Sequence, residues 1–130
     1  MKVNPRSHVP IYLQIAEEVR AAIAAEIYRP GEPLPSLRVM AIDIQVNPNT
    51  VQRAYDALER EGLIYSQRGK GLFVTEQGAA SAQTHARQTV QRAFKEGIRT
   101  GRAAGMNAEQ MRDVFNTAID GVAQAEEPRG

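Results

Sequence analysis

Two predicted helix starts in the first half of the chain lack the acidic residues that usually occupy such positions. Ser36 can cap the first of these helices and Asn47 the second, with Pro48 at the first helical position. Helix first turns favour Asp or Glu because the helix dipole is positive there. These two first turns instead hold Arg38, Asn49 and Thr50. Since unpaired amides at a positive helix end bind anions, we expect both helix starts to face phosphate groups.

The helix predicted after Asn47 has a polar face in its first two turns, directed away from an apolar stripe that includes Val51 and Tyr55. Asn and Gln can bridge N6 and N7 of adenine, and Arg can bridge O6 and N7 of guanine. A simple cap on a solvated face is the alternative for any one of these residues. Because five such residues occur together, we predict that they enter a DNA major groove. They are Asn47, Asn49, Thr50, Gln52 and Arg53.

Two further groups of residues are predicted to contact the same DNA. Ser36 can donate to a phosphate while it caps its helix, and Arg38 carries a positive charge where the helix dipole opposes it. Arg68, Gly69 and Lys70 form the tip of a predicted hairpin, where glycine permits close approach of the backbone to a groove. A surface arginine without a role and an ordinary glycine turn are the alternatives.

These residues need a frame of helices and strands, which the apolar periodicity predicts. The expected helices cover residues 11–27, 37–45 and 48–61, and the expected strands cover residues 63–67 and 72–75. An extended arm over residues 1–10 precedes them, a stiff connector covers residues 29–35, and Gly62 ends the third helix in a Schellman cap. Residues 68–71 join the strands. The order predicts a mainly α fold with a small β-hairpin, a winged helix-turn-helix over residues 1–76.

Residues 77–130 are predicted to form a two-helix dimerisation region with a disordered tail after Ala125. A long helix is expected over residues 81–104, and Asn107 with Gln110 matches a capping box at the start of another. Both helices carry apolar stripes, and a second copy of the chain is their expected cover. The alternative is that they fold back on their own winged domain. The stripe residues predicted to meet the partner are Val90, Phe94, Gly97, Ile98, Gly101, Met111, Val114, Phe115, Ala118, Ile119 and Val122.

Charged residues also form stripes on these two helices. The basic stripe is Arg92, Lys95, Arg99 and Arg102, and the acidic stripe is Glu109, Asp113 and Asp120. We hypothesise that the stripes pair within the chain or across a dimer and set its register, since exposed ion pairs contribute only ~0–1 kcal/mol. A solvated face and an extra contact with flanking DNA are the alternatives.

Composition argues against several other functions. The chain has 130 residues and a net charge of +1, and its length suffices for one small domain and an appendage. It has no cysteine, so it cannot form a thiolate metal site. Neither His8 nor His85 belongs to a ligand-spaced cluster, and residues 69–71 lack the rest of a phosphate-binding loop. We therefore expect no enzyme, no metal and no cofactor. No signal-like start or apolar run near ~18 residues occurs, which favours a cytoplasmic protein without a membrane partner.

At this point the ordered motifs of the chain resemble a known family, the GntR family of bacterial transcription regulators. The motifs are Leu34-Pro35-Ser36-Leu37-Arg38, Val46-Asn47-Pro48-Asn49-Thr50-Val51, Ala54-Tyr55, Leu58-Glu59, Glu61-Gly62-Leu63-Ile64 and Gly69-Lys70-Gly71-Leu72-Phe73-Val74. Pro10-Ile11-Tyr12 with Gln14-Ile15 resembles its YtrA-like subfamily. Many family members have Glu at Leu37 and Arg at Gln52, so the chain departs from the pattern at those two positions.

The resemblance implies a homodimeric repressor that binds an imperfect palindromic operator in double-stranded DNA, often one that governs a transporter operon. It places family DNA contacts at Ser36, Arg38, Asn47, Asn49, Thr50, Arg68 and Gly69. Larger members carry effector domains, but two helices cannot enclose a typical ~300–1,000 Å³ pocket within one chain. The possibility that a small-molecule effector binds at a dimer interface, or between the wing and the helices, is left open. The alternatives from other classes are a winged-helix protein-interaction module and an enzyme fragment.

Overall fold

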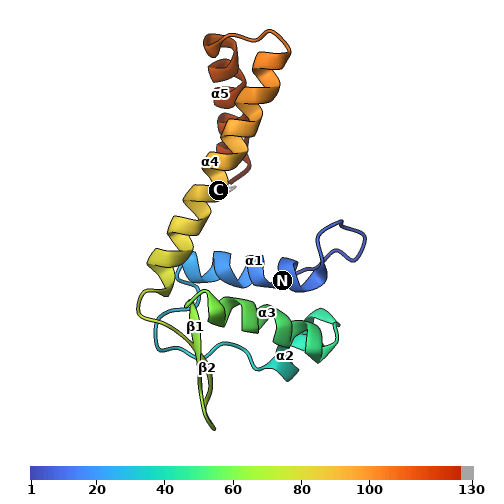
Figure 1. Ribbon diagram of the computed structural model, residues 1–130, viewed down its shortest axis with the longest axis vertical. Helices are drawn as coiled ribbons and strands as arrows, with labels where there is room; N and C mark the ends of the chain where they lie inside the picture. Colours follow the sequence, from blue (N-terminus) through green and yellow to red (C-terminus); the bar gives the residue numbers. More distant parts are fainter. Residues whose placement is uncertain (127–130) are drawn as a thin grey trace. The chain divides into compact units, whose positions relative to one another are not determined.

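The computed structural model describes residues 1–126 in two compact units, which divide between Arg87 and Gln88. The first unit holds three helices, a hairpin and the start of a fourth helix, and the second holds the rest of that helix and a fifth (Figure 1). The elements are α1 (Ile11–Ala24), α2 (Leu37–Ile44), α3 (Pro48–Arg60), β1 (Ile64–Gln67), β2 (Gly71–Val74), α4 (Gly78–Ala103) and α5 (Ala108–Glu126). The predicted fold, mainly α with a small β-hairpin in a winged helix-turn-helix, is confirmed.

The first unit extends beyond residue 76 because the first turns of α4 pack into its core. Ala82 is 1% exposed there. A Cβ added to Gly78 would lie 2.8 Å from Val74 Cγ1, so this glycine allows α4 to begin close to the hairpin and earlier than residue 81. The functional division after residue 76 stays a prediction. Apart from Glu126 at the end of α5, the tail predicted to be disordered lies outside the described residues.

The end of α1 differs from the expectation. The helix stops at Ala24, whereas the apolar pattern predicted that it continues to Ile27. Glu26 adopts a left-handed φ of 59°, and its N–H donates to Ile23 O at 3.0 Å. The N–H of Ile27 donates to Ala22 O at 2.8 Å, which completes a Schellman cap. A non-glycine residue at the left-handed position gives no signal in the sequence, so this helix end was predicted wrongly.

The ends of α2 and α3 agree with the prediction to within one residue. Gln45 takes a left-handed φ of 56° at the end of α2. After α3, Gly62 has φ 78° and donates to Glu59 O at 3.0 Å, while the N–H of Leu63 donates to Leu58 O at 3.1 Å. These two bonds form the predicted Schellman cap, and the left-handed φ explains the need for glycine.

The central helix of the first unit is α3, which packs against α1, α2 and β1 (Figure 1). Its apolar stripe faces that of α1, and the paired residues are at most 1% exposed. They are Ile15, Val19, Ile23, Val51, Ala54, Tyr55 and Leu58. Burial of such side chains contributes about 1.5–3 kcal/mol each, so this core holds the start of α3 in a fixed orientation.

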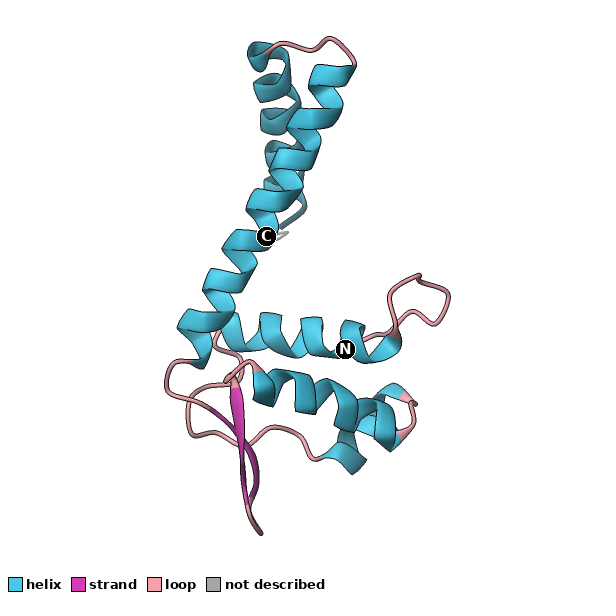
Figure 2. Ribbon diagram, in the orientation of Figure 1, coloured by secondary structure: helices cyan, strands magenta, loops and turns pink. Residues whose placement is uncertain are grey.

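The hairpin is a two-stranded antiparallel sheet whose register places Gln67 opposite Gly71 (Figure 2). The loop is therefore residues 68–70, shorter than predicted. The N–H of Lys70 donates to Gln67 O at 2.9 Å and closes the turn. Gly71, expected in the loop, begins β2 with φ 110°. A positive φ suits glycine and is strained for other residues, which is why the strand can start here.

The connector between α1 and α2 runs beside β2 rather than away from the domain. The N–H of Gly31 donates to Val74 O at 3.1 Å, and the N–H of Leu34 donates to Leu72 O at 2.8 Å. Isolated bridges also pair Pro30 with Val74 and Pro33 with Phe73. The connector thus supports the hairpin, and its prolines stiffen it.

The N-terminal segment is a closed loop, whereas an extended arm was predicted. Gln14 of α1 accepts from Asn4 N at 2.7 Å through Oε1. Its Nε2 donates to Asn4 O at 2.9 Å and to Val9 O at 2.8 Å. The prolines correctly excluded helix, but the sequence pattern did not reveal that one side chain folds the segment back on α1.

The second unit is a helical hairpin formed by residues 88–103 of α4 and by α5. Asn107 and Gln110 form the predicted capping box: Asn107 Oδ1 accepts from Gln110 N, and Gln110 Oε1 accepts from Asn107 N, each at 2.9 Å. Phe94 and Phe115 pack edge to face with ring centroids 5.5 Å apart. These contacts define the α4–α5 pair.

Gly101 and Gly97, both predicted to meet the partner chain, differ in their surroundings. A Cβ added to Gly101 would lie 2.8 Å from Met111 Sδ, so Gly101 lets α5 of the same chain approach. A Cβ added to Gly97 would meet no atom within 4 Å. Gly101 therefore packs within the chain, and a partner contact at Gly97 stays a prediction.

Candidate nucleic-acid interface

Both helix starts singled out from the sequence are capped and open to solvent. Ser36 Oγ accepts a hydrogen bond from Val39 N at 3.1 Å, and Asn47 Oδ1 accepts one from Asn49 N at 2.8 Å. Neither α2 nor α3 has an acidic residue in its first turn. The exposed residues are Ser36, Arg38, Asn47 and Asn49, and Thr50 is half-buried. The positive ends of both helices are therefore available to an anionic partner.

Tyr55 connects the core of α3 to the residue just before the Ser36 cap. Its ring is 1% exposed, and its hydroxyl donates to Pro35 O at 2.9 Å. Burial, with a smaller effect from nearby Tyr28, raises the pKa of the Tyr55 hydroxyl well above its ordinary value of 10.0. The sequence predicted Tyr55 only as a core residue, because periodicity does not show where a buried hydroxyl points. The structure makes it a positioning residue for the start of α2.

Tyr55→Phe should lower the free energy of unfolding by roughly 1–2 kcal/mol, because it removes this bond and leaves Pro35 O without its partner. Since the folded pKa of Tyr55 is raised, its contribution is fully present below pH ~10 and is lost as the pH rises above that value. Urea unfolding at a series of pH values measures both effects. The control is Tyr65→Phe, a tyrosine that is 40% exposed, which should change stability by less than ~0.5 kcal/mol. Equal stability and equal alkaline behaviour of Tyr55→Phe and wild type would contradict this role.

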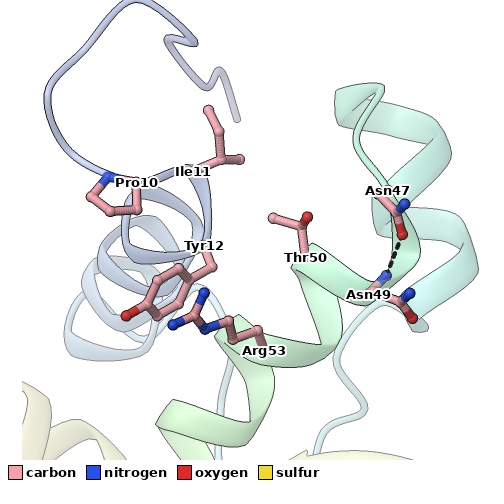
Figure 3. A pocket seen from close by; sticks show the side chains of 7 residues that line it. All are labelled: Pro10, Ile11, Tyr12, Asn47, Asn49, Thr50 and Arg53. Atoms are coloured by element: carbon pink, nitrogen blue, oxygen red, sulfur yellow. Dashed lines mark hydrogen bonds between the residues drawn. The ribbon is translucent and has the colours of Figure 1, made fainter.

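A hollow of about 410 Å³ lies beside the start of α3 (Figure 3). The residues that line it are Pro10, Ile11, Tyr12, Asn47, Asn49, Thr50 and Arg53. The guanidinium carbon of Arg53 lies 3.9 Å from the centroid of the Tyr12 ring, a cation–π contact between α3 and α1. Nothing in the spacing of Tyr12 along the sequence indicates a partner on another helix.

Gln52 also has a partner, on its own helix. Its Nε2 donates to Asp56 Oδ1 at 2.7 Å, and both residues are exposed. A bidentate contact with adenine uses one of the two N–H groups of the amide together with its oxygen, so the bond to Asp56 occupies one of the two donors of Gln52. Among the predicted groove residues, Gln52 and Arg53 are therefore held by neighbours, while the exposed Asn49 lies at the tip of the helix.

The hairpin tip presents all three of its predicted contact residues to solvent: Arg68, Gly69 and Lys70. Gly69 has φ 78°, which lets the turn form at the tip. The hairpin is also tied to α3, because the N–H of Ser66 donates to Glu59 Oε2 at 3.2 Å. The tip is thus a basic projection of a hairpin that is hydrogen-bonded to α3.

Arg20 is a buried positioning residue that sequence reasoning missed. It is 8% exposed and bonds to Glu61 Oε1 and Oε2 at 2.9 and 2.7 Å. A third bond, at 2.6 Å, reaches Glu17 on its own helix. The charge pairs therefore tie α1 to the end of α3. The available signal was an arginine next to the apolar stripe of α1 with a carboxylate at i−3.

Comparison with known proteins decides the family. The model of bacterial regulatory proteins of the gntR family matches residues 11–74. The HTH-type transcriptional repressor YtrA of Bacillus subtilis is 34% identical over 113 residues, which cover 87% of this chain and 87% of that protein. The chain belongs to the GntR family. It is accordingly a DNA-binding transcriptional regulator with a winged helix-turn-helix domain.

Solved structures agree with this assignment to the GntR family. A GntR family transcriptional regulator from Listeria monocytogenes has a TM-score of 0.76 and 29% identity, and covers 88% of this chain and 98% of that chain. AraR(DBD) in complex with operator ORX1 has a TM-score of 0.54 and 28% identity, and covers 58% of this chain and 95% of that chain. The second of these structures was solved in complex with an operator.

No helix within residues 1–126 of this GntR regulator is both long and apolar enough to cross a bilayer. Among the side chains of residues 1–125, no three His, Cys, Asp or Glu residues come together as a metal site would require. YtrA and the Listeria monocytogenes protein are named as transcriptional regulators rather than enzymes.

Proposed function

We propose that this chain acts as a homodimeric repressor in the bacterial cytoplasm, where it binds an imperfect palindromic operator. One observation carries the DNA-binding half of the proposal. The starts of α2 and α3 are capped by the exposed residues Ser36 and Asn47, and neither helix has a carboxylate in its first turn. The repressor role is supported by the similarity to YtrA, which is named as a transcriptional repressor. The operator complex of AraR supports a DNA contact through the same domain.

In this proposal α3 enters the major groove and the hairpin tip follows the backbone beside it. The proposed contact residues are Ser36, Arg38, Asn47, Asn49, Thr50, Gln52, Arg53, Arg68, Gly69 and Lys70. Asn49 is exposed at the tip of α3 and is suited to a base edge, while Arg38 adds positive charge at the neighbouring helix start. Two copies would place two such helices in successive grooves.

The dimer is supported by the exposed apolar stripe of the second unit. Among residues 88–125 only Gly101 is buried, and Met106 and Met111 are half-buried. The large apolar side chains of the stripe are 41–60% exposed: Val90, Phe94, Ile98, Val114, Phe115, Ile119 and Val122. Two helices with so little buried surface need a cover, and a second copy with the same stripe provides one.

The charged stripes do not pair within the chain. Arg99 forms its ion pair with Glu96 on its own helix, and Arg92 donates to Thr89 Oγ1 at 3.2 Å. No ion pair joins α4 to α5 among the side chains of residues 88–125. Pairing of the basic and acidic stripes across a dimer stays a proposal. The basic stripe lies on the other side of α4 from the apolar residues, and this position favours a solvated face or a DNA contact.

Selection of bound oligonucleotides from a random duplex pool by the full chain tests this function. We expect enrichment of an imperfect palindrome, with affinity that falls steeply as salt rises because phosphate contacts release counterions. Recovery of one unpaired half-site would contradict the dimeric mode. Absence of any salt-dependent duplex binding would favour the alternative of a winged-helix module that binds proteins.

A further inference from the structure

We propose that Tyr12 positions Arg53 to contact a DNA phosphate, an inference that rests on the proposed operator binding. The two side chains come from the start of α1 and the second turn of α3, and both line the hollow beside the recognition helix. The guanidinium carbon lies 3.9 Å from the ring centroid. Tyr12 thus becomes part of the DNA-binding surface without having to touch a base.

The contact fixes the orientation of the guanidinium while leaving its hydrogen-bond donors available. A guanidinium stacked on a ring has its N–H groups in its own plane, so they point past the ring toward a further partner. Among the side chains of residues 1–125, Arg20 and Arg99 form ion pairs with carboxylates and Arg53 forms none. Arg53 is also exposed. It is therefore a positioned cation that lacks an anion.

The Tyr12 ring is itself held in place. Tyr12 is half-buried in the first turn of α1, a helix whose apolar face packs on α3. Gln14 donates to Val9 O at 2.8 Å and thereby fixes the chain just before the helix. A platform anchored on both sides loses little entropy when it holds Arg53, so the pair is organised before DNA arrives.

The direction of Arg53 favours a phosphate over a base. Figure 3 shows its side chain turned toward Tyr12 on α1, away from Asn47 and Asn49 at the tip of α3. Bases are read by the first residues of a recognition helix, whereas phosphates are met at its sides, where the backbone flanks the groove. Arg53 therefore contributes affinity and register, and base choice falls to residues nearer the helix start.

The test compares four full-length variants with wild type on two duplexes, one recovered from the random pool and one with its sequence scrambled. Arg53→Ala should weaken binding to both duplexes by the same factor, about tenfold or more, and should reduce the salt slope by about 0.9 for each phosphate that Arg53 neutralises. Tyr12→Leu removes the ring beneath Arg53 and should weaken binding about two- to fivefold for each copy of Arg53 in the complex. Tyr12→Phe keeps the ring and should bind as wild type. Tyr12→Leu combined with Arg53→Ala should bind no more weakly than Arg53→Ala alone.

Three results would overturn the proposal: wild-type affinity in Tyr12→Leu, an equal decrease from Tyr12→Leu with and without Arg53, or a decrease in Arg53→Ala that is confined to the selected duplex. The last result would assign Arg53 to a base. If circular dichroism shows that Tyr12→Leu has reduced helix content, Tyr12→Met replaces it, because an unbranched side chain fills the same space. A wild-type protein that binds neither duplex would instead refute the proposed function, so the two failures are distinguishable.

Discussion

The Ile119→Asp variant should be monomeric at concentrations where the wild-type protein is dimeric. Ile119 is 52% exposed on α5, in the stripe that the proposed partner covers. Burial of an isoleucine contributes about 1.5–3 kcal/mol, and a two-fold interface contains the residue twice. The substitution removes both contributions and adds two carboxylates, so the dimer should weaken by at least about 3 kcal/mol, on the order of a hundredfold in its dissociation constant. Sedimentation over a concentration series measures this change.

Asn116→Asp is the matched control for this prediction. Asn116 is exposed on the same helix outside the stripe, and its replacement adds the same charge with little change in shape. The control should stay dimeric, and both variants should keep wild-type helix content. Operator affinity should fall only in Ile119→Asp, because two linked half-site contacts become independent. Wild-type sedimentation of Ile119→Asp would mean that a second copy does not cover this face.

Arg38→Ala should weaken binding to the selected operator by on the order of 1–3 kcal/mol if Arg38 meets a base. The residue is exposed in the first turn of α2, where its charge opposes the helix dipole. Stability should rise slightly or stay unchanged, because that unfavourable interaction is removed. Fluorescence anisotropy on the selected and scrambled duplexes distinguishes a base contact from a phosphate contact. Removal of a phosphate-binding side chain weakens binding to both duplexes equally, whereas removal of a base contact weakens binding to the selected duplex more.

Arg60→Ala is the control for Arg38→Ala. Arg60 is exposed at the last turn of α3, the opposite end from Asn47, so its removal makes the same change in net charge away from the proposed interface. It should reduce affinity far less than Arg38→Ala at equal salt. Equal decreases in the two variants would assign the effect of Arg38 to overall charge, and intact specific affinity in Arg38→Ala would remove it from the interface.

The features that could be predicted from the sequence are those decided within one turn of helix. Ser36 and Asn47 cap through bonds to residues two or three positions ahead, and Asn107 with Gln110 forms its capping box over the same span. Gly62 is required by a left-handed φ at a helix end. Such contacts depend only on local spacing, so the residue types alone identify them.

The features that were missed join segments that are distant along the chain or lack a residue signal. Tyr55 reaches Pro35, and Arg20 reaches Glu61, only because α3 packs between α1 and the connector. The end of α1 was misplaced because a glutamate, not a glycine, occupies its left-handed position. Periodicity indicates which face of a helix is buried but not which polar atoms meet there.

By itself, the order of residues determined the winged helix-turn-helix, the uncharged caps that start α2 and α3, and the uncovered stripes of α4 and α5. These features depend on which residues can cap a helix and on the spacing of apolar residues, and both are set by the sequence itself. Only the tertiary structure decided that Arg53 lies on Tyr12 and that Gly101 packs against Met111. Each of these contacts exists because two helices pack at a particular distance and angle, and that geometry arises from the packing of whole helices rather than from any one segment.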